Sequence, residues 1–155
     1  MGNQARAGSW HSSKNRQDYQ HGMWVRRLRK EMLPSETEAR KLGYSQGVKA
    51  GNIIFLSGHV ALDSKGEVVG INDFSKQVRC VFDNLQTTLR LKGACLSDIV
   101  KITVYLTDIR NLQEYRKIRA EYFKDWFPAS TLVQVGSLIM KELMIEIDAV
   151  AILNQ

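Results

Sequence analysis

The chain has 155 residues, 44% of them hydrophobic and 25% charged, a composition typical of one soluble globular domain with a normal core. No apolar run approaches the roughly 20 residues of a membrane span, so a membrane is not expected as a partner. Two cysteines are too few for a disulfide framework, and a reducing, cytoplasmic setting is expected.

The net charge of +6 is concentrated at one end of the chain. Residues 1–35 hold seven Lys or Arg against two Asp or Glu, whereas residues 36–155 hold fifteen against fourteen. We therefore predict a basic, flexible N-terminal extension over residues 1–35 and a nearly neutral folded domain over residues 36–155. A nearly neutral domain does not favour nucleic acid as a partner.

Apolar residues within the extension fit one side of a short basic helix. Two interpretations stay open: a targeting or docking helix, and a segment that packs on its own domain or on a neighbouring subunit. We favour the second. The apolar residues concerned are Trp24, Val25, Leu28 and Met32.

The first part of the domain is predicted to be β-structure. Residues 42–50 and 52–58 form two predicted strands around a turn at Ala50-Gly51. The segment 63–66, Asp-Ser-Lys-Gly, carries residues that favour tight turns, so a short return strand is predicted over residues 67–69.

Two amphipathic helices are predicted next, with a β-branched, alternating strand over residues 99–106 between them. Asp73 can cap the first helix and Gly93 can end it, while Asn111 can cap the second. The apolar stripe of the first helix is Phe74, Val78, Val81, Leu85 and Leu89, and that of the second is Leu112, Tyr115, Ile118 and Tyr122.

Residues 128–151 predict two strands joined by a short polar turn, the first marked by period-two alternation from Ser130. In the second strand Glu146 and Asp148 share a face with Met144, opposite an apolar face. A carboxylate in an apolar strand loses hydration at a cost in free energy, so it is expected to have a bonding partner or a catalytic role. We therefore expect chemistry at Glu146 and at the face that carries Ser130 and Leu132.

The predicted order β-β-β-α-β-α-β-β indicates an α+β domain: one mixed sheet with two helices packed on a single face. Two helices cannot cover apolar side chains on both faces of such a sheet, which predicts self-association through it. The apolar residues concerned are Ile102, Val104, Val133, Val135, Ile145 and Ile147.

Short segments spread along the chain match one family pattern. They are residues 43–48, 50–52 and 57–58, the helix 77–89, and residues 98–102, 105–108, 127–129 and 145–147. Together, over residues 42–152, they resemble the reactive-intermediate deaminase (Rid) family, also labelled YjgF-like or L-PSP endoribonuclease-like. The resemblance implies a chorismate-mutase-like (YjgF-like) fold and a homotrimer with clefts between subunits.

The resemblance also implies hydrolysis of small reactive enamines or imines to ketones and ammonia, with no metal or organic cofactor. Under it, Tyr44 and Glu146 take the catalytic positions, and Ser57 and Gly58 belong to the substrate site. A small-molecule imine, enamine or other metabolite is the expected ligand.

Ser130 departs from the family pattern, which has an arginine there that binds the substrate carboxylate. A hydroxyl cannot replace a bidentate, charge-assisted pair, and the loss is on the order of a few kcal/mol, or roughly several hundred-fold in affinity. Leu132 stands where a small, Cys-like residue is usual, and Arg116 where Asn is frequent. Arg116 could supply the missing charge or be an exposed helix residue.

Three functions therefore stay open: an enamine or imine deaminase acting on substrates other than the usual 2-imino acids, a non-catalytic trimer that binds a small metabolite, and an endoribonuclease. His59 could act as an acid or base near neutral pH, but a structural role is favoured. His11, His21 and His59 show no ligand spacing, so a metal is not expected.

Overall fold

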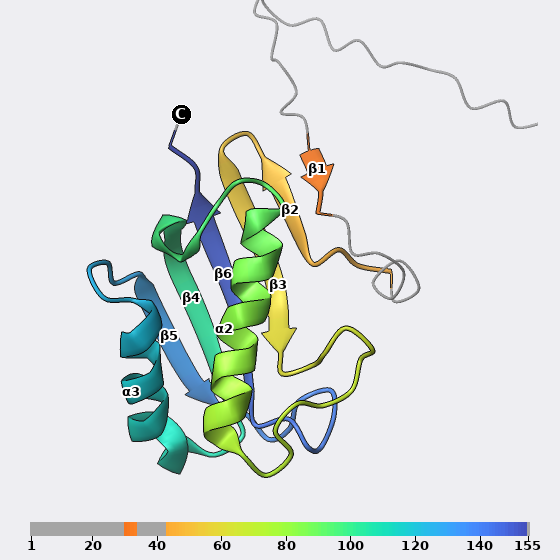
Figure 1. Ribbon diagram of the computed structural model, residues 1–155, viewed down its shortest axis with the longest axis vertical. Coiled ribbons are helices and arrows are strands. Elements are labelled where there is room, and N and C mark those ends of the chain that lie inside the picture. The colour runs from red at the N-terminus through yellow and green to blue at the C-terminus, as the bar shows by residue number, and fades with distance from the viewer. Residues whose placement is uncertain (1–29, 34–42, 155) are drawn as a thin grey trace, which may run out of the picture.

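The computed structural model describes residues 30–33 and 43–154. In this part of the chain, six strands form one mixed sheet in the order β1-β2-β3-β6-β4-β5 (Figure 1). Only β4 and β5 pair in parallel among these strands. The strands are β1 (Lys30–Met32), β2 (Gly47–Ala50), β3 (Ile53–Val60), β4 (Ile99–Leu106), β5 (Ala129–Gln134) and β6 (Ile145–Ile152).

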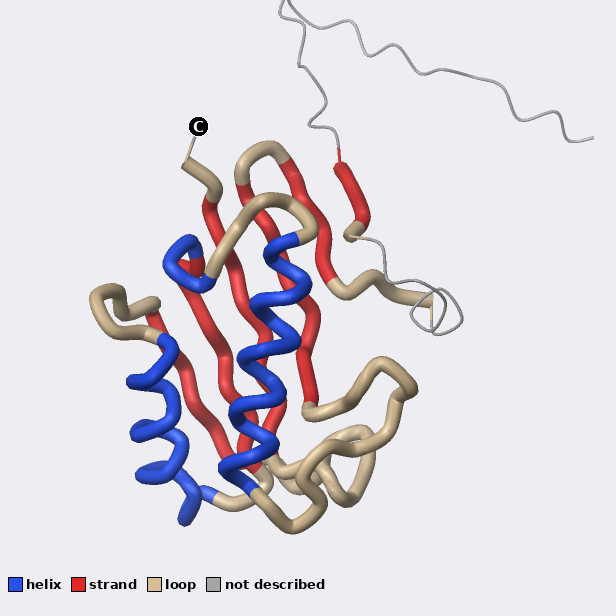
Figure 2. Tube along the Cα trace, in the orientation of Figure 1, coloured by secondary structure: helices blue, strands red, loops and turns tan. Residues whose placement is uncertain are grey.

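Two helices, α2 (Phe74–Arg90) and α3 (Leu112–Tyr122), lie on the same side of this sheet (Figure 2). The α+β class with a mixed sheet and two helices on one face is thereby confirmed. The Asp73 side chain accepts a hydrogen bond from the Lys76 backbone N–H at 2.9 Å, as predicted for a cap. Beyond the helix end, Gly93 is left-handed at φ +71°.

The second helix begins differently from the prediction. Asn111 makes no side-chain cap, and a 3₁₀ turn (Ile109–Asn111) precedes the helix. Asp108 caps that turn by accepting from the Arg110 N–H at 2.9 Å. Tyr115 and Ile118 are the fully buried members of the predicted stripe.

The apolar core lies between the helices and one face of the sheet. Along β6, Ile145, Ile147 and Ala149 are at most 1% exposed, while the intervening residues are half-buried, so the predicted division into two faces is confirmed. Four of the six apolar residues named above are buried, but Val133 is 40% exposed, so the two helices do not cover all six, as predicted. Exposed apolar side chains on the other face are Phe55, Val133 and Ile152.

Residues 30–33, which lie in the segment predicted as an extension, pack on the domain of the same chain, in agreement with the interpretation that we favoured. Lys30–Met32 pair with β2, so Met32 lies in a strand and not in the predicted helix. Leu33 is 1% exposed, and its N–H donates to the Gly47 carbonyl at 2.8 Å. Trp24, Val25 and Leu28 lie outside the described residues, and the flexible extension stays a prediction there.

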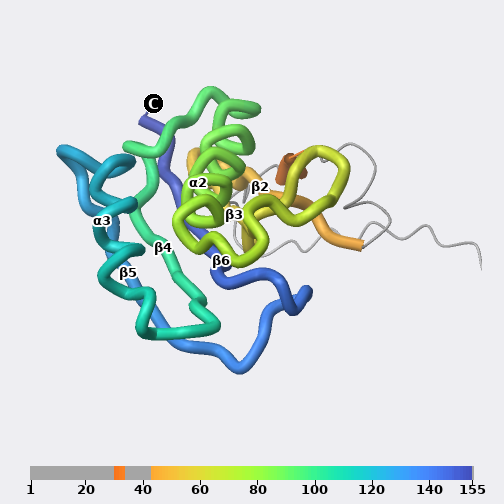
Figure 3. The backbone as a smooth tube through the Cα atoms, turned by 60° about the horizontal axis from the view of Figure 1, so that its bottom comes forward, coloured from red at the N-terminus to blue at the C-terminus, as the bar shows by residue number. Residues whose placement is uncertain are grey.

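Two long connections gather at the end of the sheet that comes forward in Figure 3, residues 61–73 and residues 135–144. The second replaces the predicted short polar turn, because β4 lies between β5 and β6 and the chain must pass it. In the first, residues 67–69 form no strand, and a single bridge joins Leu62 to Val68. No helix in the described ranges is long and apolar enough to cross a membrane.

Candidate functional site

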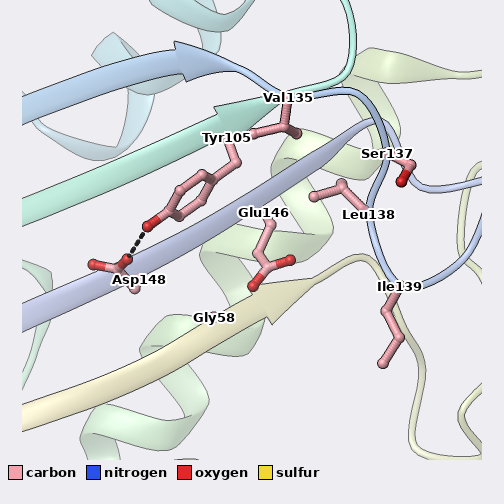
Figure 4. A pocket seen from close by; sticks show the side chains of 8 residues that line it. All are labelled: Gly58, Tyr105, Val135, Ser137, Leu138, Ile139, Glu146 and Asp148. Carbon is pink, nitrogen blue, oxygen red and sulfur yellow. Dashed lines mark hydrogen bonds between the residues drawn. The ribbon is translucent and has the colours of Figure 1, made fainter.

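An open groove of about 340 Å³ lies on the face of the sheet that the helices leave uncovered. β3, β4 and β6 form its floor, and the segment after β5 forms one wall (Figure 4). It is lined by Gly58, Tyr105, Val135, Ser137, Leu138, Ile139, Glu146 and Asp148.

Glu146 reaches from β6 across the floor toward Gly58 on β3 (Figure 4). Its carboxylate has no hydrogen-bond or ion-pair partner among the described residues. Burial, and next the nearby Asp148 carboxylate, raise the pKa of Glu146 above its ordinary value. The groove therefore presents a partly desolvated carboxylate that can bind a water molecule or a donor group of a ligand.

Gly58 is the residue that leaves space for this carboxylate. A Cβ atom at position 58 would lie 1.8 Å from Glu146 Oε1 and 2.7 Å from its carboxyl carbon. Any side chain at position 58 would therefore displace the carboxylate from the floor of the groove.

Tyr105 and Asp148 form the second polar pair in the groove. The Tyr105 hydroxyl donates to Asp148 Oδ2 at 3.0 Å, and this bond is the main reason that the pKa of Tyr105 is raised (Figure 4). Tyr105 also lies directly opposite Glu146 in the pairing of β4 with β6. The Tyr105 hydroxyl therefore donates its hydrogen bond to Asp148, and the Glu146 carboxylate stays available to bind a ligand or a water molecule.

The wall formed by residues 135–144 is held from beneath by Gln77 of α2. The Gln77 side chain is fully buried and makes bonds to backbone groups of both long connections. It donates to the Glu142 carbonyl at 2.8 Å and the Gly70 carbonyl at 3.2 Å, and it accepts from the Met144 N–H at 2.8 Å. Ile139, 76% exposed, stands on this wall at the mouth of the groove.

Of the residues predicted for the site, the structure brings together Glu146 and Gly58. Ser57 is adjacent, but its hydroxyl donates to the Ser45 carbonyl at 2.7 Å. Tyr44 is half-exposed and is not part of the groove lining.

Ser130 and Leu132 lie on the other face of the sheet. They pair with Ile102 and Val104, whose side chains are buried under the helices, and directly paired residues share a face. Arg116 is exposed on α3, which covers that same face. Within one chain these three residues therefore cannot join Glu146, and a site that contains both groups needs a second copy.

His59 is 8% exposed and bonded through both ring nitrogens, which agrees with the favoured structural role. Burial lowers the pKa of His59 below its ordinary value. Among residues 30–33 and 43–154, no three His, Cys, Asp or Glu side chains are placed to hold a metal ion.

Sequence reasoning missed Tyr105 and the groove wall. Tyr105 could have been found from its strand alternation only if its partner across the sheet had been known. The wall residues Ser137, Leu138 and Ile139 carry no motif, so no local signal pointed to them.

A family model and two relatives are similar to most of this chain. The endoribonuclease L-PSP family model matches residues 36–153. The chain is 39% identical over 124 residues to a RutC family protein of Pyrococcus horikoshii, covering 79% of this chain and 97% of that one. It is 33% identical over 120 residues to the 3-aminoacrylate deaminase RutC of Acinetobacter baylyi, covering 77% and 94%.

Among solved structures, the fold is similar to that of YyfA from Yersinia pestis, a member of the conserved Rid protein family. The TM-score is 0.73 at 32% identity, and the similarity covers 81% of this chain and all of that one.

Proposed function

The chain belongs to the endoribonuclease L-PSP family, which includes the Rid proteins, and we propose that it hydrolyses small reactive enamines or imines to carbonyl compounds and ammonia. A relative named as a deaminase supports this reaction class. The observation that carries the proposal is the Glu146 carboxylate, half-buried in an open groove and without a partner among the described residues.

Glu146 acts in this proposal as a general base and then as a general acid. As a bound water attacks the imine carbon, one of its protons passes to the carboxylate and then to the nitrogen, which gives a carbinolamine. The carboxylate next takes the hydroxyl proton and passes it to the nitrogen while the C–N bond breaks, so that the C=O bond forms and ammonia leaves. A raised pKa suits a carboxyl group that must both accept and return a proton near neutral pH, and such catalysis is typically worth about 10²–10⁴-fold.

The substrates we infer are uncharged, in place of the usual 2-imino acids. Ser130 offers no cation, and, within the described part of one chain, the groove lining contains Glu146 and Asp148 but no Lys or Arg. A carboxylate-bearing substrate would meet like charges in a partly desolvated groove, which is unfavourable.

Self-association into a homotrimer is part of the same proposal. Phe55, Val133 and Ile152 leave apolar surface on the uncovered face, and burying it against other copies is favourable. Packing between copies would also bring Tyr44, Ser130 or Leu132 of one copy to the groove of another, whereas Arg116 stays an exposed residue of α3. Two free cysteines fit the reducing, cytoplasmic setting that we assign to it.

The direct test measures ammonia release from freshly generated iminopropionate, iminobutyrate and uncharged imines, against buffer alone. We expect acceleration for uncharged imines and about a hundredfold loss or more in Glu146→Gln. Glu142→Gln, which changes a glutamate in the wall segment outside the groove lining, is the matched control and should keep full activity. Ser130→Arg should gain turnover of iminopropionate.

Three results would overturn the proposal. No acceleration with any imine, together with a metabolite bound in the groove, would assign the chain as a non-catalytic binder. RNA cleavage that survives extensive purification and is lost in Glu146→Gln would assign a ribonuclease. A monomer in sedimentation-velocity experiments at micromolar concentration would refute the shared site.

A further inference from the structure

β3 contains a bulge beside the groove. Leu56 pairs with Ala149 and His59 with Ile147, so β3 advances by three residues while β6 advances by two. Ser57 and Gly58 occupy the bulge, opposite Asp148. A bulge leaves one residue outside the regular ladder and changes the direction of the local side chains. Here it places Gly58 beneath the Glu146 carboxylate.

His59 binds this bulge from the helix side of the sheet. Its Nδ1 lies 2.8 Å from the Ser57 carbonyl oxygen, and its Nε2 lies 2.8 Å from Thr88 Oγ1 on α2. A carbonyl oxygen can only accept, so Nδ1 carries a proton and donates it. In the neutral ring, Nε2 then accepts from the Thr88 hydroxyl, whose single proton is shared with the Asn84 carbonyl at 3.1 Å.

The bulge is thus held from two sides. On the β2 side, the Ser57 N–H donates to the Gln46 carbonyl at 2.9 Å and its hydroxyl to the Ser45 carbonyl at 2.7 Å. On the helix side, the His59 ring joins the Ser57 carbonyl to α2. Because His59 is buried, losing it would leave Ser57 O and Thr88 without their ring partner, and water has poor access to replace it.

We infer that His59 is a positioning residue: by fixing the Ser57–Gly58 bulge against Thr88 of α2, it holds the space in which the Glu146 carboxylate lies. The inference concerns geometry, and only its kinetic consequence rests on the proposed hydrolysis. A displacement of about 1 Å at a reacting group can reduce turnover by about 10²-fold.

The test uses three variants of the full chain. His59→Leu removes both ring bonds, His59→Gln keeps an amide N–H that can reach the Ser57 carbonyl, and Thr88→Val removes only the helix partner. We expect kcat for an uncharged imine to fall about ten- to hundredfold in His59→Leu with KM nearly unchanged. His59→Gln should recover most of kcat, and Thr88→Val should lie between.

A second measurement does not depend on activity. Crystal structures of wild type and of His59→Gln and Thr88→Val should show the Glu146 carboxylate over Gly58 in wild type and His59→Gln, and displaced in Thr88→Val. The structures of these two variants test the positioning role of His59 even if the His59→Leu variant does not fold.

Different results overturn the two proposals. A wild type inactive on every imine refutes the hydrolysis, while the crystal structures still test the positioning. Equal kcat losses in His59→Gln and His59→Leu would refute the donor bond as the cause. An unmoved bulge and carboxylate in Thr88→Val, with full kcat, would refute the connection to α2.

Discussion

On the helix side of β6, Ile145, Ile147 and Ala149 are at most 1% exposed, whereas on the other side Glu146 and Asp148 line an open groove. The two faces alternate residue by residue along one strand. The covered face gains its stability from apolar burial and needs no polar partners. The uncovered face can therefore carry Glu146, a carboxylate with no partner in the described part of the chain, because the core on the opposite side holds the strand in place.

The largest effect should follow a change on the covered face. Ile147→Ala removes a fully buried side chain from the middle of β6 and should lower the free energy of unfolding by about 3–4 kcal/mol, through lost burial and the cavity left behind. Urea denaturation measures it. Ile147→Val is the matched control, with a loss near 1 kcal/mol. A loss of less than about 1 kcal/mol in Ile147→Ala would mean that the covered face does not gain its stability from apolar burial.

A smaller effect is expected where the core holds the groove wall. Gln77→Met keeps the volume but leaves the Glu142 carbonyl and the Met144 N–H without a partner, so we expect a loss of about 2–3 kcal/mol. The Gly70 carbonyl loses one bond but still accepts from the Asp73 N–H at 2.9 Å. Hydrogen exchange at Met144 should accelerate. Gln113→Met, an exposed change on α3, should alter neither quantity. Unchanged exchange at Met144 would show that the wall is held by other contacts.

On the uncovered face, a substitution is expected to raise the free energy of unfolding instead of lowering it. The pKa of Glu146 is raised in the folded chain, so the folded state binds this proton more tightly, and the penalty for ionisation grows as pH rises through the folded pKa. Glu146→Gln removes that penalty and should raise stability at pH 7 by less than about 1 kcal/mol, since solvent screens a half-exposed group.

That gain should vanish below pH 4, where the carboxyl group is protonated in both the folded and the unfolded chain. Thermal unfolding at several pH values measures it, with Glu142→Gln as control. A lower melting temperature for Glu146→Gln at pH 7 would show that the Glu146 carboxylate has a stabilising partner, in contrast to what residues 30–33 and 43–154 show.

The smallest effect is expected at the outer surface of the helix layer. Arg79 of α2 forms a bidentate ion pair with Glu121 of α3, and both side chains are about half exposed. Arg79→Met should leave the free energy of unfolding almost unchanged, and any difference should disappear at 1 M salt. A loss in the free energy of unfolding as large as that of Gln77→Met would mean that this exposed ion pair contributes as much to stability as the buried Gln77 bonds.

The local pattern of the sequence determined much of this fold. Period-two alternation assigned the two faces of β6 and the bounds of β4, and Asp73 marked the start of α2, because these features depend on neighbours a few residues apart. Glu146 was singled out for the same reason, since a carboxylate in an apolar strand is visible without a structure.

The tertiary structure alone decided how these pieces meet. The insertion of β4 between β5 and β6, the bond from Tyr105 to Asp148 and the pairing of Lys30–Met32 with β2 join residues far apart in the chain. Strand order and register are set by such long-range contacts, and one extra residue changes which face a side chain occupies. For that reason the bulge that places Gly58 beneath Glu146, and the placement of Ser130 and Leu132 on the opposite face, could not be predicted from local pattern.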